Sequence, residues 1–122
     1  MTGAGHPWPL RLCVDRAKRE LEISFDEGTS FTLPAELLRV ESPSAEVQGH
    51  SPVERRTPAG KRLVGITELQ PVGNYAVRIV FDDGHATGIF SWSNLLRIGK
   101  NREQLWQGYL ARLASQGLAR DP

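Results

Sequence analysis

One sequence pattern occurs twice in this chain. Phe25-Asp26-Glu27-Gly28 is followed by Leu37-Leu38-Arg39-Val40, and Phe81-Asp82-Asp83-Gly84 is followed by Leu95-Leu96-Arg97-Ile98. The second copy begins 56 residues after the first, at residue 81 against residue 25. Acidic residues followed by glycine favour a tight turn between two strands, and the Leu-Leu-Arg segment suits a short helix. The pattern therefore predicts two strand-turn-strand-helix units.

Length and composition fit one ordinary domain. The chain has 122 residues, of which 39% are hydrophobic and 24% charged, close to globular averages. A domain of this size buries roughly 65% of the surface that its unfolded chain exposes. Fifteen Lys and Arg against fourteen Asp and Glu give a net charge of +1. Without a strong basic excess, a nucleic-acid partner is not expected.

The single cysteine, Cys13, has no partner for an internal disulfide or a zinc-binding pair. No segment approaches 18 consecutive apolar residues, and the N-terminus has no apolar run of signal-peptide length. We therefore expect a cytoplasmic protein that neither spans a membrane nor binds one. Residues 1–9 are expected to form a flexible tail, and residues 10–117 the single domain.

Alternation of apolar and polar residues predicts six strands. Their expected ranges are Leu10–Val14, Leu21–Phe25, Ser30–Leu33, Leu63–Gln70, Tyr75–Phe81 and Ala86–Phe90. Helices are expected over Ala35–Glu41, with Pro34 suited to the first turn, over Trp92–Ile98, and from Asn101 to about Gly117. The predicted fold class is α+β: a mostly antiparallel sheet of about six strands with two short helices and a C-terminal helix.

Helix boundaries carry their own signals. Ser91 is placed to cap the second helix, and Gly99 to end it in a left-handed conformation. Asn101 with Gln104 is typical of a capping box that opens the last helix, and Gly117 of its end.

Three aromatic residues belong to these helices. Trp92, Trp106 and Tyr109 are expected in the core by default. If the last helix is only partly covered, Trp106 with Tyr109 would instead form a protein-docking face. Gly108, inside the same helix, costs about 1 kcal/mol relative to Ala unless another element packs closely against it.

Residues 42–62 show neither helical nor strand periodicity. Structureless loops of this length are uncommon in compact domains and are usually functional or mobile, so the segment is the best place to look for a site. Arg55, Arg56, Lys61 and Arg62 make it locally basic, which would suit an anion or an acidic protein. The favoured alternative is a solvated charge cluster, and a mobile insertion stays open.

Catalytic and metal-binding motifs give little support to an enzyme. His6, His50 and His85 form no His-x-Asp or His-x-x-x-His pair. Cys13 could serve as a nucleophile only if the fold brought a histidine to it. The acidic residues of both repeats are explained by turn chemistry. Phosphate-binding glycine motifs and the Gly-x-Ser-x-Gly elbow do not occur.

Three segments carry a resemblance to a known family. They are the ten residues from Leu38 to Val47, Gly73-Asn74-Tyr75, and the stretch from Asp83-Gly84-His85 to Ser91-Trp92. Over about Leu10 to Gly99 the chain resembles the gamma-butyrobetaine-hydroxylase-like N-terminal domain, in its small stand-alone bacterial form, a domain of unknown function. In that family the domain also precedes two-oxoglutarate oxygenases and accompanies ATPases that carry iron-sulfur clusters. This chain lacks the oxygenase's His-x-Asp iron motif and the length for its catalytic barrel.

The resemblance also implies a zinc site that this chain has lost. In the oxygenase members a Leu-Arg segment leads into Cys-x-Cys-x-x-Cys, which binds zinc with a histidine from a later turn. The matching positions here are Ser42, Ser44 and Val47 for the cysteines and His85 for the histidine. Serine hydroxyls stay protonated near pH 7 and valine has no lone pair, so we expect no zinc and no other cofactor. A hydrogen bond from His85 to the start of the long loop would be the relic of that site.

The expected function is a non-catalytic accessory or protein-interaction domain, with iron-sulfur or metalloprotein maturation as the setting that the resemblance implies. A protein partner is expected, and a monomer is the favoured oligomeric state. The expected interaction surface comprises Ser42, Ser44, Glu46, His50, Arg55, Arg56, His85 and Trp92. Two alternatives stay open: a residual metal-binding domain using His85 and Asp83, and an enzyme of unrecognised type with His50 or His85 beside Asp82 or Cys13.

Overall fold

The computed structural model describes residues 8–15, 17, 19–44, 47 and 57–121. Its strands are β1 (Pro9–Val14), β2 (Glu20–Phe25), β3 (Ser30–Pro34), β4 (Ile66–Val72), β5 (Ala76–Phe81) and β6 (Ile89–Ser91). They form two antiparallel three-stranded sheets, in the orders β1-β2-β3 and β4-β5-β6. The α+β class is confirmed, and the six strands are divided between two sheets.

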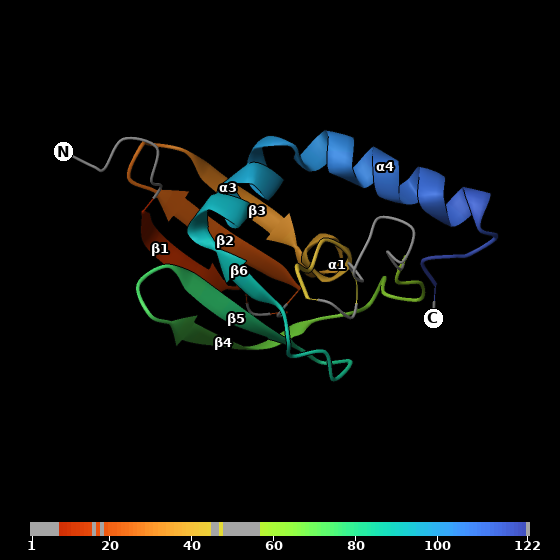
Figure 1. Ribbon diagram of the computed structural model, residues 1–122, viewed down its shortest axis with the longest axis horizontal. Helices are drawn as coiled ribbons and strands as arrows, with labels where there is room; N and C mark the ends of the chain where they lie inside the picture. The colour runs from red at the N-terminus through yellow and green to blue at the C-terminus, as the bar shows by residue number, and fades with distance from the viewer. Residues whose placement is uncertain (1–7, 16, 18, 45–46, 48–56, 122) are drawn as a thin grey trace.

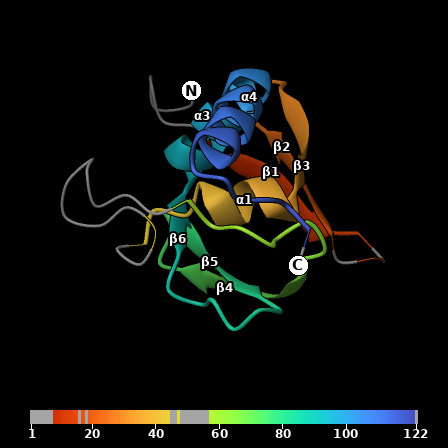
Figure 2. The same cartoon turned by 90° about the vertical axis from the view of Figure 1, so that its right-hand side faces the viewer.

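Three helices complete the described part of the fold: α1 (Ala35–Val40), α3 (Trp92–Lys100) and α4 (Arg102–Ser115). Helix α4 lies on the opposite side of the molecule from β4, and α1 lies between α4 and the β4-β5-β6 sheet (Figures 1 and 2). The described residues include no helix with the length and apolarity that a membrane span requires.

The core comes from the central strand of each sheet together with the helices. Leu21, Ile23 and Phe25 on β2 are buried, and Val77, Ile79 and Phe81 on β5 are buried with them in one hydrophobic cluster. The period of two that predicted these strands therefore marks their inward-facing side chains.

Both acidic turns have the same backbone hydrogen bonds. In the first, the Phe25 N–H donates to Thr29 O at 2.8 Å and the Gly28 N–H to Phe25 O at 3.1 Å. In the second, the Phe81 N–H donates to His85 O at 2.9 Å and the Gly84 N–H to Phe81 O at 3.2 Å. The two glycines have φ values of 97° and 92°, a region that favours residues without a Cβ. The predicted repeat is confirmed, and His85 occupies the position that Thr29 occupies in the first turn.

Two of the predicted helix signals are confirmed. The Ser91 hydroxyl accepts a hydrogen bond from the Asn94 N–H at 3.0 Å, which caps α3. Gly117 follows α4 with a φ of 66°.

Two other boundary predictions are wrong. Gly99 lies inside α3, and a Cβ there would come within 2.6 Å of the Phe31 ring, so close packing rather than a left-handed turn requires glycine. The capping box is absent, because the Asn101 side chain donates to Arg97 O of the preceding helix at 2.8 Å.

Strand boundaries differ in the second half. Pro71 and Val72 lie outside the predicted strand Leu63–Gln70, but they belong to β4 and pair with Val77 and Ala76. Strand β6 begins only at Ile89, so residues 86–88 lie outside it.

Candidate functional site

The first residues after α1 are fastened to the second acidic turn. Ser42 Oγ lies 3.0 Å from His85 Nε2. Ser42 is fully buried and His85 is 4% exposed. The Ser42 hydroxyl also accepts a hydrogen bond from the Ser44 N–H at 3.3 Å. The predicted hydrogen bond between His85 and the start of the long loop is therefore confirmed.

The same turn also holds the far end of that loop. Asp83 Oδ2 lies 2.9 Å from Arg39 Nε on α1 and 2.6 Å from Lys61 Nζ, near the end of residues 42–62. The Asp83 Oδ1 atom accepts a hydrogen bond from the His85 N–H at 3.0 Å. We call Arg39, Ser42, Lys61, Asp83 and His85 the turn cluster.

The electrostatics of Asp83 follow from these partners. Partial burial alone would raise the pKa of its carboxyl group. Hydrogen bonds from Lys61, the His85 N–H and Arg39 outweigh that effect and lower the pKa to about 2, from an ordinary value of 3.8. Asp83 is therefore held as an anion between two cations.

Ser42 packs closely against the backbone of Gly88. A Cβ at Gly88 would lie 2.5 Å from Ser42 Oγ, so the close approach of the loop to residue 88 requires glycine. Arg39 Nη1 is buried without a hydrogen-bond partner among the described residues. The cluster is therefore tightly packed where Ser42 meets residue 88.

A serine oxygen 3.0 Å from a histidine nitrogen has the spacing of a nucleophile and its base. Both residues are buried here, so a substrate has no direct access to the Ser42 hydroxyl. Cys13 lies on β1, where its sulfur accepts a long hydrogen bond from Arg11 at 3.7 Å, and Asp82 is exposed. The contacts of the turn cluster attach both ends of the 42–62 segment to the second acidic turn.

Comparison with known proteins identifies the family. The family model of the gamma-butyrobetaine hydroxylase-like N-terminal domain matches residues 12–96. The chain belongs to this family. The resemblance expected over Leu10 to Gly99 is thereby confirmed over most of its length. Among curated proteins, none matches the chain.

Solved structures are also similar to this chain. One protein solved by NMR in solution is 44% identical, with a TM-score of 0.84 over 97% of this chain and 93% of its own. A second is 49% identical, with a TM-score of 0.82 over 100% of this chain and 92% of its own. A crystal structure of a DUF971-family protein of unknown function from Acidithiobacillus ferrooxidans is 37% identical, with a TM-score of 0.62 over 75% of this chain and 91% of its own.

The zinc site that the gamma-butyrobetaine hydroxylase-like resemblance implies does not fit this chain. Its three cysteine positions are Ser42, Ser44 and Val47, and Val47 is a buried apolar side chain. Among the described residues, no group of three His, Cys, Asp or Glu side chains could hold a metal ion. Hydroxyls and an aliphatic side chain cannot replace thiolates around zinc.

The expected interaction residues are only partly brought together. Ser42, Ser44 and His85 meet in or beside the turn cluster. The Trp92 indole N–H donates to Asn74 O at 2.9 Å. Asn74 precedes the start of β5, whereas His85 follows its end, so Trp92 lies at the opposite end of this strand from His85. The remaining expected residues lie outside the described part of the chain: Glu46, His50, Arg55 and Arg56.

Sequence reasoning did not find a second cluster, at the C-terminal tail. Arg120 donates two hydrogen bonds to Glu36 on α1, from Nε at 2.9 Å and from Nη2 at 2.8 Å. Its guanidinium carbon lies 4.9 Å from the centre of the Trp106 ring on α4. We call Glu36, Trp106 and Arg120 the tail cluster. Arg120 lies beyond the last predicted element, so no periodicity marked it.

Tyr109 belongs to the core beside this cluster. It is fully buried, and its hydroxyl donates to Pro58 O at 2.8 Å. Burial and the nearby Glu36 carboxylate raise the pKa of Tyr109 to about 12. The default expectation of a core position is therefore confirmed for Tyr109, so the alternative docking face cannot include it, whereas Trp106 is partly exposed.

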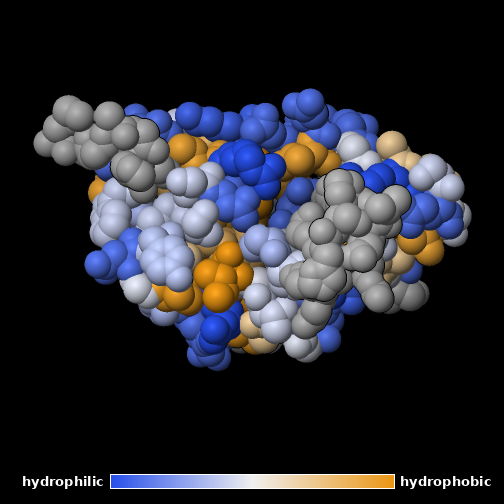
Figure 3. Space-filling view, viewed as in Figure 1, coloured by the Kyte–Doolittle hydropathy of each residue, from blue (hydrophilic) through white to orange (hydrophobic). Residues whose placement is uncertain are grey.

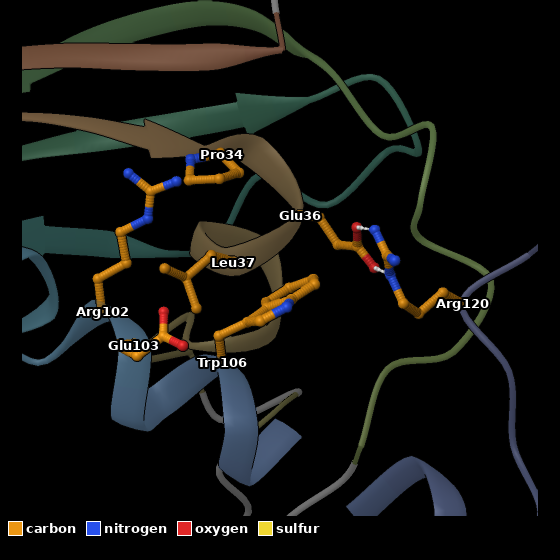
Figure 4. Close-up of a pocket in the computed structure, with 7 residues that line it drawn as sticks. All are labelled: Pro34, Glu36, Leu37, Arg102, Glu103, Trp106 and Arg120. Carbon is orange, nitrogen blue, oxygen red and sulfur yellow. Dashed lines mark hydrogen bonds and ion pairs between the residues drawn. The ribbon is translucent and has the colours of Figure 1, made fainter. Parts of the chain in front are cut away.

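A groove of about 260 Å³ borders the tail cluster. Figure 4 shows Arg102 and Pro34 at one end of this groove, the Glu36–Arg120 pair at the other, and Trp106 between them. A second hollow of about 410 Å³ shares Pro34, Glu36 and Arg120 with the first. The tail cluster therefore stands between two hollows.

Proposed function

We propose that this chain is a non-catalytic protein-interaction domain that presents residues of the 42–62 segment, Arg55 and Arg56 among them, to a protein partner. The observation that carries the proposal is the double attachment of the long segment to the second turn. Ser42 at its start binds His85, and Lys61 near its end binds Asp83. A segment fixed at both ends on a packed scaffold loses less conformational entropy on binding than a free tail does.

Burial of the turn cluster supports an interaction role over a catalytic one. Its serine and histidine are enclosed, whereas a catalytic pair must reach a substrate. On the face shown in Figure 3, hydrophilic side chains cover most of the surface and apolar ones emerge in separate patches. Such a surface suits a polar, reversible contact.

The partner that we propose has an acidic surface. Arg55 and Arg56 are adjacent in the presented segment. Clustered arginines recognise carboxylates by paired hydrogen bonds and speed the association of oppositely charged proteins. The family's association with cluster-carrying ATPases makes iron-sulfur or metalloprotein maturation the setting that we propose, by analogy.

We also propose that the chain works without a bound metal. His85 Nε2 already contacts Ser42, and Asp83 already binds two cations. Both side chains therefore have polar partners without a metal ion. Elemental analysis of protein purified without chelator should find far less than one zinc or iron per chain. One equivalent of metal that disappears in His85→Ala would overturn this part of the proposal.

The interaction is tested by capture from the native host with the tagged chain. Arg55→Ser/Arg56→Ser should lose an iron-sulfur carrier or assembly protein that the unmodified chain retains, by at least about tenfold in affinity for two charge-assisted contacts. Arg97→Ser is the matched control, because Arg97 is an exposed arginine that binds Asn94 on its own helix. Equal capture of the same partner by the loop variant and the control would refute the role of the segment.

A further inference from the structure

The tail cluster has the parts of an arginine-recognition site. Glu36 supplies both carboxylate oxygens to one guanidinium, and the Trp106 ring stacks against it. The Glu36 side chain is 6% exposed, whereas the Arg120 side chain is 37% exposed. The acceptor is thus built into the fold, and the arginine approaches it from the surface.

The arginine reaches this site on a segment that belongs to no helix or strand. After Gly117 the tail runs beside residues 60–62, where the Gly60 N–H donates to Ala119 O at 2.9 Å and the Arg62 N–H to Arg120 O at 3.0 Å. Leu118 is 40% exposed, so it adds little apolar burial. Arg62 Nη1 also donates to Asp121 Oδ1 at 2.8 Å, in an ion pair whose two side chains are exposed. The tail therefore resembles an extended peptide bound through backbone hydrogen bonds, one exposed ion pair and the guanidinium of Arg120 as its enclosed anchor.

Space remains on both sides of the anchor. The groove beside Trp106 and the hollow beside Arg62 both include Glu36 and Arg120 in their walls, and both are open to further side chains. A bound segment could therefore place residues on either side of its arginine into these hollows, which the tail itself leaves unfilled.

Removal of Arg120 would leave the Glu36 carboxylate enclosed without its charge partner. A buried carboxylate without a cation is strongly unfavourable, so exchange of Arg120 for another cation is favoured over its simple release. The two-oxygen acceptor and the flat aromatic ring favour a planar guanidinium over an ammonium group.

We propose that Glu36 and Trp106 form a recognition site for an extended, arginine-containing segment of a partner protein, and that the C-terminal tail occupies this site in the isolated chain. The inference rests on the proposed function only in requiring a protein partner. It assigns that partner a second contact, of basic chemistry, away from the presented segment.

The test uses the full chain with Arg120→Ala and a peptide with the sequence of residues 118–122. The indole N–H signal of Trp106 is followed by NMR during titration. The peptide should shift this signal and bind the variant at least tenfold more tightly than the unmodified chain, whose own tail competes at high effective concentration. A peptide with lysine in place of arginine should bind at least fivefold more weakly, and Glu36→Gln in the Arg120→Ala chain should abolish binding.

Arg120→Lys is the second variant if Arg120→Ala does not fold, because it retains a cation near Glu36 while lacking the guanidinium. No shift of the Trp106 signal, equal binding to variant and unmodified chain, or equal binding of the lysine and arginine peptides would each overturn the inference. Failure here with Arg55- and Arg56-dependent capture intact would leave the proposed function standing. The reverse result would remove the proposed function and leave this site.

Discussion

The two copies of the strand-turn-strand-helix pattern share one backbone geometry and have different surroundings. The first turn is at the surface, where Glu27 contacts Thr29 at 2.9 Å and Lys100 at 3.7 Å. The second turn also reaches the surface, at Asp82 and Gly84, but its His85 is buried, and its Asp83 and His85 bind the ends of another segment. The two turns therefore have the same backbone hydrogen bonds and different structural roles. The side chains at two positions decide whether the turn is a surface feature or an anchor.

The largest effect is expected at the position where the copies differ most. His85→Ala removes a buried ring that packs near Phe81, at 5.9 Å between centroids, and takes the hydrogen-bond partner from Ser42. It should lower the free energy of unfolding by about 3 kcal/mol. Thr29→Ala, the equivalent change in the first copy, should cost less than about 0.5 kcal/mol. Urea denaturation of both variants measures the difference, and equal losses would break the comparison.

The next effect tests how the two copies are joined. Gly99 follows Leu-Leu-Arg-Ile in the second copy and packs against Phe31 of the first, while Glu41 holds the corresponding place in the first copy. Gly99→Ala gains helix propensity but forces the Phe31 ring to move, for a net loss of about 1.5 kcal/mol. Thermal unfolding followed by circular dichroism would show this loss. An unchanged or higher melting temperature would mean that the joint accommodates a methyl group.

A smaller effect on stability, which depends on pH, is expected to distinguish Asp83 from Glu27, the acidic side chain at the equivalent position of the first turn. The folded-state pKa of Asp83, about 2, lies below its ordinary value of 3.8, so its stabilisation is present above about pH 4 and is lost as the pH falls towards 2. Asp83→Asn should cost roughly 1 kcal/mol at pH 7, after allowance for solvent screening, and should flatten the pH dependence of stability between 4 and 2. Glu27→Gln should change stability by less than about 0.5 kcal/mol. Identical acid profiles for Asp83→Asn and the unmodified chain would contradict the electrostatic role of the second turn.

The smallest effect is a stabilisation outside both copies. A Cβ at Gly108 of α4 would meet only Arg112 Nη1, at an ordinary 3.7 Å. Gly108→Ala should therefore raise the free energy of unfolding by about 0.5 kcal/mol through helix propensity alone. This variant is the matched control for Gly99→Ala, since the same substitution should have opposite signs in neighbouring helices. Loss of stability in both would assign the Gly99 effect to something other than its contact with Phe31.

Local sequence signals predicted those features that depend on local chemistry. The paired turns follow from glycine at positive φ, and the start of α3 follows from the Ser91 hydroxyl. Gly99 was predicted wrongly because a glycine is required there by close packing against Phe31, which is 68 residues away in sequence (99 against 31). The Asn101 cap was predicted wrongly because its side-chain amide donates to Arg97 O of the preceding helix and makes no cap hydrogen bond to α4.

The candidate site was predictable only where the family resemblance supplied the pairing. Ser42 and His85 are 43 residues apart, and nothing in their spacing indicates a contact. Asp83 was explained by turn chemistry, which is correct but incomplete, because Arg39 and Lys61 meet it only in the folded chain. Glu36 and Arg120, 84 residues apart, carry no periodic signal at all.

The central claim is that the second turn anchors the long segment through Ser42 and His85. A double-mutant cycle with Ser42→Ala, His85→Ala and the combined variant measures that coupling directly, by urea denaturation at pH 7. We predict that the sum of the two single losses exceeds the combined loss by about 1 kcal/mol, the usual range for residues in direct contact. Losses that add to within about 0.3 kcal/mol would mean that the two residues act independently, and would contradict the anchor.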